Sequence, residues 1–269
     1  MSTYAKEVLL ALSLKYDGNY EKIVDEIKNK TNRFPKDEME KWKGNIKSNV
    51  VTIVDDNYPQ CFKTIFSPPI VLYYYGNLSL LEKTYKITCI GTRKPTLYQT
   101  DTCYNFIKEA IKAFDNDLVV ISGMAHGLDQ TFMRAAMELN APVVSIIGSG
   151  IDNPYPKVND GLYEYCKSNN GLIISEYPNE LQAKPENFLF RNRLLAGGSE
   201  ILFLGGASLH SGSQATVRYA VDLGKEIVAL PCNVTGDDLT NYIIKDGAGM
   251  ILSSNDLIYE IKSACKNNS

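Results

Sequence analysis

The sequence predicts an α/β fold: a doubly wound, mostly parallel sheet with a small N-terminal helical domain. Two observations lead to this prediction. From Tyr85 onward, short and nearly continuous apolar runs alternate with helix-length amphipathic segments, as expected for parallel strands that are buried on both faces and joined by crossover helices. Before residue 50, apolar residues recur at helical spacing, for example at Val8, Leu9 and Leu12.

The first 50 residues predict the small helical N-terminal domain. Its expected helices span residues 4–14, 20–30 and 36–47. A turn-forming triplet, Asp17-Gly18-Asn19, separates the first two helices.

Residues 51–84 predict a β-rich entry segment of the main domain. An apolar run at 50–54 is typical of a strand. The pair Pro68-Pro69 then precedes a second β-rich run at 70–76.

Residues 85–269 are predicted to form the main domain. Its expected strands lie at 86–90, 118–121, 143–147, 172–174, 200–204 and 226–230. Amphipathic helices are expected between them, at 97–114, 128–140, 158–169, 189–198 and 212–224. A last strand at 250–252 and a last helix at 254–264 close the domain.

The composition is typical of a globular protein. Hydrophobic residues make up 44% of the 269 residues and charged residues 22%, which are ordinary values. No apolar run approaches the roughly 20 residues of a membrane span, and the N-terminus does not resemble a signal peptide. The six cysteines include no Cys-x-x-Cys pair, so we expect reduced cysteines, no metal site and a cytoplasmic protein that does not contact membranes.

The charge balance limits how the chain can bind nucleic acid. The formal net charge is −3, and the part from Tyr85 onward carries more acidic than basic side chains. A broad positive face is therefore not expected. Any DNA binding would have to use a local basic pocket.

Glycines and hydroxyl residues follow nearly every predicted strand of the main domain. In chain order these residues are Gly91-Thr92, Ser122-Gly123, Gly148-Ser149-Gly150, Ser175, Gly205-Gly206 and, before a helix, Ser211-Gly212-Ser213. The carboxyl ends of the strands form the ligand crevice of an open α/β sheet. Glycines let backbone amides approach a ligand, and helix N-termini attract anions, so the sequence predicts a phosphate-binding edge.

The sequence predicts no cofactor and no catalytic residue for this edge. The first strand is not followed by Gly-x-Gly-x-x-Gly, and the chain contains no Gly-x-x-x-x-Gly-Lys-Ser/Thr, so the signatures of a dinucleotide enzyme and of a P-loop ATPase are missing. We expect His126 and His210 on surface loops. Asp129 and Glu176 are candidate acid–base carboxylates, but Asp129 is expected to cap a helix or to hold a basic neighbour.

Residues 188–193 supply basic and aromatic groups, with the sequence Phe188-Leu189-Phe190-Arg191-Asn192-Arg193. Two guanidinium groups with an amide between them could clamp a phosphodiester, and the flanking rings could stack on an unpaired base. Arg93 would add a third cation. In the alternative interpretation, the two arginines pair with acidic neighbours and the two phenylalanines belong to the core.

A series of motifs between about residues 50 and 250 follows the order known from one family. The motifs are Tyr58-Pro59, Pro68-Pro69-Ile70-Val71-Leu72-Tyr73, Gly91-Thr92-Arg93, Ser122-Gly123-Met124-Ala125-His126-Gly127-Leu128-Asp129, Gly148-Ser149-Gly150-Ile151-Asp152, Tyr155-Pro156, Ser175-Glu176-Tyr177-Pro178, Arg191-Asn192-Arg193-Leu194-Leu195-Ala196-Gly197 and Ser211-Gly212-Ser213. This series resembles the DprA/Smf family of DNA-processing proteins.

The resemblance implies an extended Rossmann-like fold that binds single-stranded DNA without sequence preference and forms a homodimer. It also implies that the protein protects incoming DNA and helps to load a RecA-type recombinase during natural transformation. By position, the DNA backbone would be held by Arg93, Arg191, Asn192 and Arg193, and Phe188 would stack on a base. The remaining predicted site residues are Gly91, Thr92, Ser122, Gly123, Ser211, Gly212 and Ser213, with Lys184 and Lys157 as weaker candidates for backbone contacts.

A nucleotide-binding sensor or a phosphoribohydrolase-like enzyme on the same fold is the alternative function. Phosphoribohydrolases of the cytokinin-activating type carry Pro-Gly-Gly-x-Gly-Thr-x-x-Glu. In this sequence Gly205-Gly206 is followed by Ser211-Gly212-Ser213, and the glutamate is missing.

Overall fold

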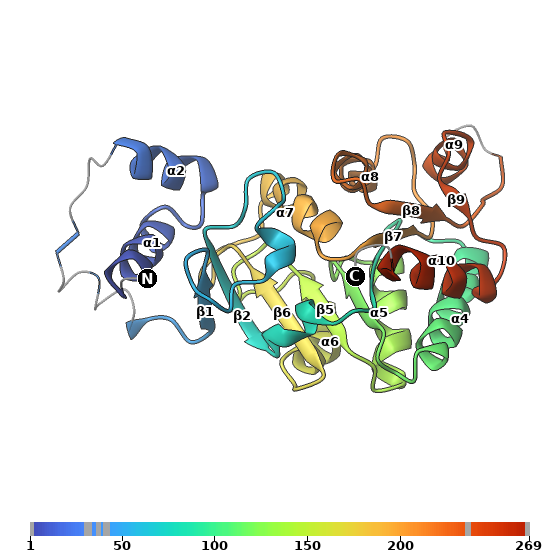
Figure 1. Cartoon of the computed structure of the whole chain (residues 1–269), viewed down its shortest axis with the longest axis horizontal. Coiled ribbons are helices and arrows are strands. Elements are labelled where there is room, and N and C mark those ends of the chain that lie inside the picture. Colours follow the sequence, from blue (N-terminus) through green and yellow to red (C-terminus); the bar gives the residue numbers. More distant parts are fainter. Residues whose placement is uncertain (1–2, 30–33, 36–38, 40–43, 235–237, 267–269) are drawn as a thin grey trace.

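A nine-stranded mixed sheet forms the centre of the molecule (Figure 1). The computed structural model describes residues 3–29, 34–35, 39, 44–234 and 238–266. The strands are β1 (Asn49–Thr52), β2 (Val71–Gly76), β3 (Lys86–Ile90), β4 (Val119–Ser122), β5 (Val143–Ile146), β6 (Gly171–Ser175), β7 (Ile201–Leu204), β8 (Glu226–Ala229) and β9 (Gly249–Met250). Their order across the sheet is β1-β2-β6-β5-β4-β3-β7-β8-β9. All neighbours from β6 to β9 pair in parallel, whereas β2 is antiparallel to both β1 and β6.

Helices cover both faces of the sheet. The described helices are α1 (Thr3–Lys15), α2 (Tyr20–Asn29), α4 (Leu97–Ala113), α5 (Leu128–Glu138), α6 (Asp160–Cys166), α7 (Pro185–Gly197), α8 (Gly212–Asp222), α9 (Leu239–Lys245) and α10 (Ser254–Lys266). One face packs against α4, α5 and α10, and the opposite face packs against α7 and α8.

Each central strand contributes to two hydrophobic cores. In β4, the side chain of Val120 belongs to the core beneath α4 and α5, whereas Val119 and Ile121 belong to the core beneath α7 and α8. Successive side chains of a strand point to opposite faces. A strand covered on both faces therefore has to be apolar at every position, which explains the continuous apolar runs in the sequence.

The chain reverses its direction of travel across the sheet next to β3. From β3 it proceeds through β4 and β5 to β6, and α7 then returns it to β7 on the other side of β3. The carboxyl ends of β3 and β7 consequently lie next to each other. Such a switch point is where open α/β sheets bind ligands.

The N-terminal helices lie at the β1 end of the sheet, and α9 with β9 lies at the other end (Figure 1). Leu10 and Leu12 of α1 join the same core as Tyr73 of β2. The hydroxyl of Tyr73 donates to Ser13 Oγ at 3.0 Å, and Lys6 pairs with Asp55 at 3.0 Å. These contacts fix α1 to the sheet.

The structure confirms the predicted fold class and corrects several elements. Helix α7 begins at Pro185 instead of residue 189, and α9 was not predicted. The helix expected at 36–47 falls mostly outside the described residues, and the division into 1–50, 51–84 and 85–269 stays a prediction. Within the part of the chain that the structure describes, no helix is both long and apolar enough to cross a membrane.

Candidate functional site

Glycines at the strand ends allow neighbouring segments to approach the carboxyl edge closely. A Cβ atom on Gly91 would lie 2.5 Å from Leu128 Cδ1, and one on Gly148 would lie 2.8 Å from Phe188 Cδ1. These two glycines therefore serve the internal packing of the edge. Gly212 is different, because it is exposed and no atom lies within 4 Å of its Cβ position.

Arg191 lies beneath this edge and is buried. Helix α7 carries it to the ends of β4 and β5, where its Nη1 donates to the carbonyl oxygens of Gly123 (3.1 Å) and Ile146. Burial lowers the pKa of Arg191 to about 10, and the nearby charge of Arg93 acts in the same direction. The guanidinium still carries its charge at neutral pH, so a fixed cation underlies the strand ends.

Asp129 holds the loop between β4 and α5. Its Oδ2 accepts hydrogen bonds from the backbone amides of Gly123 (3.1 Å) and Ala125 (3.2 Å). Burial raises the pKa of Asp129 to about 6, although the charge of Arg191 and the backbone amides oppose this effect. The carboxylate thus satisfies two loop amides in front of α5 and interacts with a basic neighbour, which matches its predicted structural role.

Phe188 is half-buried in the first turns of α7 and contacts both Arg191 and Tyr155. Its ring centroid lies 5.9 Å from Arg191 Cζ and 5.8 Å from the centroid of the Tyr155 ring. The sequence did not place Tyr155 in the site, because only the fold brings this residue next to Phe188. Its position in the Tyr155-Pro156 motif is the signal that could have indicated it.

The three cations predicted to contact the DNA backbone from outside residues 191–193 are exposed: Arg93 after β3, Lys157 after β5, and Lys184 immediately before α7. Within the described part of the chain, none of them forms an ion pair. The neighbouring Thr92 shapes its loop, because its carbonyl oxygen accepts the amide of Leu128 at 3.1 Å. These cations are therefore available to an anionic ligand.

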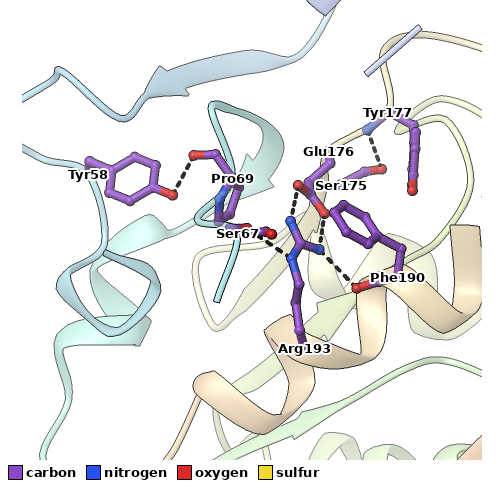
Figure 2. Close-up of polar contacts among 8 residues, drawn as sticks. All are labelled: Tyr58, Ser67, Pro69, Ser175, Glu176, Tyr177, Phe190 and Arg193. Atoms are coloured by element: carbon purple, nitrogen blue, oxygen red, sulfur yellow. Dashed lines mark hydrogen bonds and ion pairs between the residues drawn. The ribbon is translucent and has the colours of Figure 1, made fainter. Parts of the chain in front are cut away.

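Arg193 occupies a different position from the one predicted. Its side chain is 1% exposed, and Nη1 and Nη2 lie 2.7 and 2.5 Å from the two carboxylate oxygens of Glu176. Figure 2 shows that the same guanidinium also donates to the carbonyl oxygens of Ser67 (3.0 Å) and Phe190 (2.9 Å). The alternative interpretation, in which this arginine pairs with an acidic neighbour, is therefore correct for Arg193.

Helix geometry explains why the two arginines do not form one clamp. Residues two apart in a helix are separated by about 200° around its axis and do not face each other. Arg191 accordingly reaches Gly123, whereas Arg193 reaches Glu176 and the chain segment at Ser67.

Asn192 and Ser122 connect backbone segments. Asn192 Nδ2 donates to the carbonyl oxygen of Gly212 at 3.1 Å and so ties α7 to the first residue of α8. Ser122 is fully buried, and its Oγ donates to the carbonyl oxygen of Cys89 at 2.7 Å. Both side chains hold the backbone segments that form the site in place.

The N-terminus of α8 is open to solvent. Gly212 is exposed and Ser213 is half-buried. The Oγ of Ser211, the residue before the helix, is buried without a hydrogen-bond partner among the described residues. The unpaired amides of a helix N-terminus favour an anion at this position.

The histidines, Glu176 and the cysteines, which could in principle take part in catalysis or bind a metal, occupy structural or surface positions. His126 and His210 are exposed on loops, as predicted. Glu176, a candidate acid or base, is committed to Arg193. No disulfide joins the six cysteines.

The fold and the site together define a class of protein. This is a Rossmann-like α/β protein whose candidate site lies at the carboxyl edge, where the segments that follow the strands carry exposed cations and a half-buried aromatic ring. The chain belongs to the family of DNA recombination-mediator protein A, whose model matches residues 49–262.

Individual relatives agree with this assignment. DNA processing protein DprA of Streptococcus pneumoniae is 32% identical over 213 residues, which are 78% of this chain and 73% of that protein. DprA of Bacillus subtilis is 30% identical, over 79% of this chain and 71% of that protein. The solved structure of the S. pneumoniae protein matches with a TM-score of 0.75, 28% identity and coverage of 94% and 93% of the two chains.

A second solved structure concerns the single-stranded DNA binding mode of DNA processing protein A from Helicobacter pylori. It matches with a TM-score of 0.72 and 29% identity, over 81% of this chain and 97% of that chain.

Proposed function

We propose that this protein binds single-stranded DNA at the carboxyl edge of its sheet. The observation that carries the proposal is the Phe188 ring, which lies half-buried at the carboxyl edge, 5.9 Å from the charged Arg191, on the helix that exposed Lys184 immediately precedes. An aromatic ring beside cations matches the two parts of an unpaired nucleotide, its base and its phosphate. Membership of the recombination-mediator family supports this assignment. The similar H. pylori protein, whose structure concerns its binding of single-stranded DNA, supports it as well.

The structure supports different roles for the residues that the sequence grouped together. We assign phosphate contacts to Arg93 and Lys184, which are exposed, and to the open N-terminus of α8. Arg191 contributes its buried charge and supports the ring of Phe188. Arg193 is assigned a structural role, because Glu176, Ser67 and Phe190 engage its guanidinium group.

The proposed site predicts a preference for single strands. Stacking on a protein ring requires a base that is free of its partner, and every base offers such a face regardless of sequence. The net charge of −3 and the small number of exposed cations imply few phosphate contacts. Affinity should therefore decrease with salt, but with a shallow slope of about 0.7 per neutralised phosphate.

The test is fluorescence anisotropy with a labelled oligo-dT of about 30 nucleotides and the matching duplex. Arg93→Ala should weaken single-strand binding by about 1–3 kcal/mol because it removes a charged donor. Lys112→Ala is a matched control: it removes a cation from the last turn of α4, where Lys112 pairs with Glu109 at 2.8 Å. Equal binding by Arg93→Ala and wild type, or a preference for duplex, would contradict the proposal.

We further propose that the bound strand is protected and delivered to a RecA-type recombinase, and that the protein acts as a homodimer. The name of the family, recombination mediator, supports the first part. Stimulation of recombinase ATPase activity on DNA coated with single-strand-binding protein would test it. Light scattering at the working concentration tests the second part, and a monomer would contradict it.

The alternative of a nucleotide-binding or phosphoribohydrolase-like protein gains no specific support. Both candidate carboxylates, Asp129 and Glu176, are buried and engaged by the protein itself. Direct titration with free mononucleotides by isothermal titration calorimetry distinguishes the two functions. Binding of a mononucleotide at micromolar concentration, with no binding of the labelled oligonucleotide in the anisotropy assay, would favour the alternative.

A further inference from the structure

We infer that Tyr155 provides a second stacking surface beside Phe188, so that the site accepts two adjacent unpaired bases. This inference rests on the proposed function and identifies a contact that the sequence analysis did not assign. It depends on three features of the structure: the exposure of the Tyr155 ring, its contact with Phe188 and the rigid support of its loop.

The ring of Tyr155 is large, apolar and 49% exposed. Its centroid lies 5.8 Å from that of Phe188, and the two ring planes are inclined by 54°. An inclined contact leaves part of each ring uncovered, because the rings meet at an angle instead of face to face. Tyr155 is thus fixed on one side by Phe188 and open to a ligand on the other.

The loop that carries Tyr155 is held on both sides. Before it, the amides of Gly150 and Asp152 donate to the carbonyl oxygens of Leu181 and Asn179, each at 2.9 Å. This segment 179–181 leads directly into α7, so the loop of Tyr155 and the helix of Phe188 are joined.

The hydrogen bonds of Asn159 fix the chain after Tyr155. Asn159 Nδ2 donates to the carbonyl oxygen of Met124 at 2.7 Å, and its amide donates to that of Pro156 at 3.2 Å. Asn159 is itself buried. A ring held in place before the ligand arrives loses little conformational entropy on binding, which favours affinity.

Charge near the two rings suits the phosphates that connect adjacent bases. Lys157 is exposed two residues after Tyr155, and Lys184 is exposed four residues before Phe188. The neighbouring carboxylate of Asp152 is engaged, because the hydroxyl of Tyr75 donates to it at 2.6 Å.

The experiment separates stacking from phosphate binding by comparing two oligonucleotides of the same length, oligo-dT and an abasic strand with the same sugar-phosphate backbone. Tyr155→Ala should weaken binding of oligo-dT by about 5- to 150-fold, the range expected for one lost stacking contact, and should leave binding of the abasic strand within about two-fold. Tyr155→Phe retains the ring and should bind both strands like wild type.

Two further variants control for folding and for exposed tyrosines in general. Tyr155→Leu keeps an apolar side chain against Phe188 but removes the aromatic face, so it should lose affinity for oligo-dT as Tyr155→Ala does. Tyr259→Ala removes another exposed tyrosine, on α10, and should change neither affinity.

The outcomes distinguish this inference from the function on which it rests. Wild-type binding of oligo-dT together with wild-type affinity of Tyr155→Leu would overturn the role of Tyr155 and leave the proposed function intact. An equal loss on both strands would also overturn it, because it would show a general effect on the site. Absence of oligo-dT binding by the wild-type protein would overturn both.

Discussion

Replacing Glu176 by glutamine tests whether Arg193 supports the fold or contacts DNA. In the wild type, two hydrogen bonds of 2.7 and 2.5 Å join the two groups in a site where the side chains are 1% and 5% exposed. Glu176→Gln keeps the shape of the side chain but removes its charge, and one of its two polar ends then presents a donor to the guanidinium. The cation then has only neutral acceptors among these groups: the remaining amide oxygen of the glutamine and the carbonyl oxygens of Ser67 and Phe190.

Removal of one partner from a buried ion pair costs about 3–5 kcal/mol, because the other charge stays buried without compensation. We therefore expect Glu176→Gln to lower the free energy of unfolding by this amount. With a urea m-value of about 3 kcal/mol per molar, the midpoint should fall by about 1 M or more. Equilibrium urea denaturation followed by circular dichroism measures the change.

A double-mutant cycle and a surface control complete the experiment. The cycle uses the single variants Glu176→Leu and Arg193→Met, each of which should be similarly destabilising, and the double variant Glu176→Leu/Arg193→Met, which should regain part of the loss, since apolar pairs often replace buried ion pairs at little cost. In the control Glu109→Gln, the partner that loses its carboxylate, Lys112, is about half exposed, so the free energy of unfolding should change by less than about 0.5 kcal/mol. A loss below about 1 kcal/mol for Glu176→Gln, or additive effects in the cycle, would refute the reasoning. So would a large loss of DNA affinity in a fully folded Arg193→Met protein.

Two further predictions follow from the same edge of the sheet. The pKa of Asp129 is raised to about 6 from an ordinary value of 3.8, so the native state binds this proton more tightly than the unfolded chain does. The free energy of unfolding should therefore fall as the pH rises from about 4 to 6, by on the order of 1–3 kcal/mol for this group. Urea denaturation of wild type and Asp129→Asn across this range should show the decline only in the wild type, and parallel pH profiles would contradict the assignment. Gly148→Ala would place a Cβ 2.8 Å from Phe188 Cδ1 and 3.1 Å from its Cα, so it should displace the start of α7, lower the free energy of unfolding by about 1–3 kcal/mol and weaken oligo-dT binding. Urea denaturation and an anisotropy titration measure the two effects, and a titration equal to wild type would contradict the role assigned to the position of the ring.

The sequence by itself determined the fold class. Parallel strands buried on both faces must be apolar at successive positions, as Val119, Val120 and Ile121 are, and this pattern can be recognised without knowing which strands pair. The same kind of pattern placed the ends of the helices less accurately. The start of α7 at Pro185 was missed, although proline is favoured at the first helical position. The seven-residue α9 is too short for a clear periodic pattern.

The sequence also located the segments of the candidate site, because the carboxyl ends of parallel strands meet at one edge. It grouped Arg191 and Arg193 in one phosphate clamp, and the structure separates them. The sequence shows both residues only as arginines of one segment. In the structure Arg191 lies beneath the strand ends, whereas Arg193 forms an ion pair with Glu176. The helical rotation between them could have indicated this difference, but the acidic partner could not be named from the sequence.

Only the tertiary structure decided which residues share the site. Phe188 and Tyr155 come from different connections of the sheet and meet because Gly148 leaves room for the ring and because segments 150–152 and 179–181 are hydrogen-bonded to each other. The spacing of apolar residues along the sequence indicates whether a residue is buried and which helix or strand it belongs to. Contacts between distant residues depend on how the elements pack, and burial of the same apolar surface allows many such arrangements until the complete core selects one.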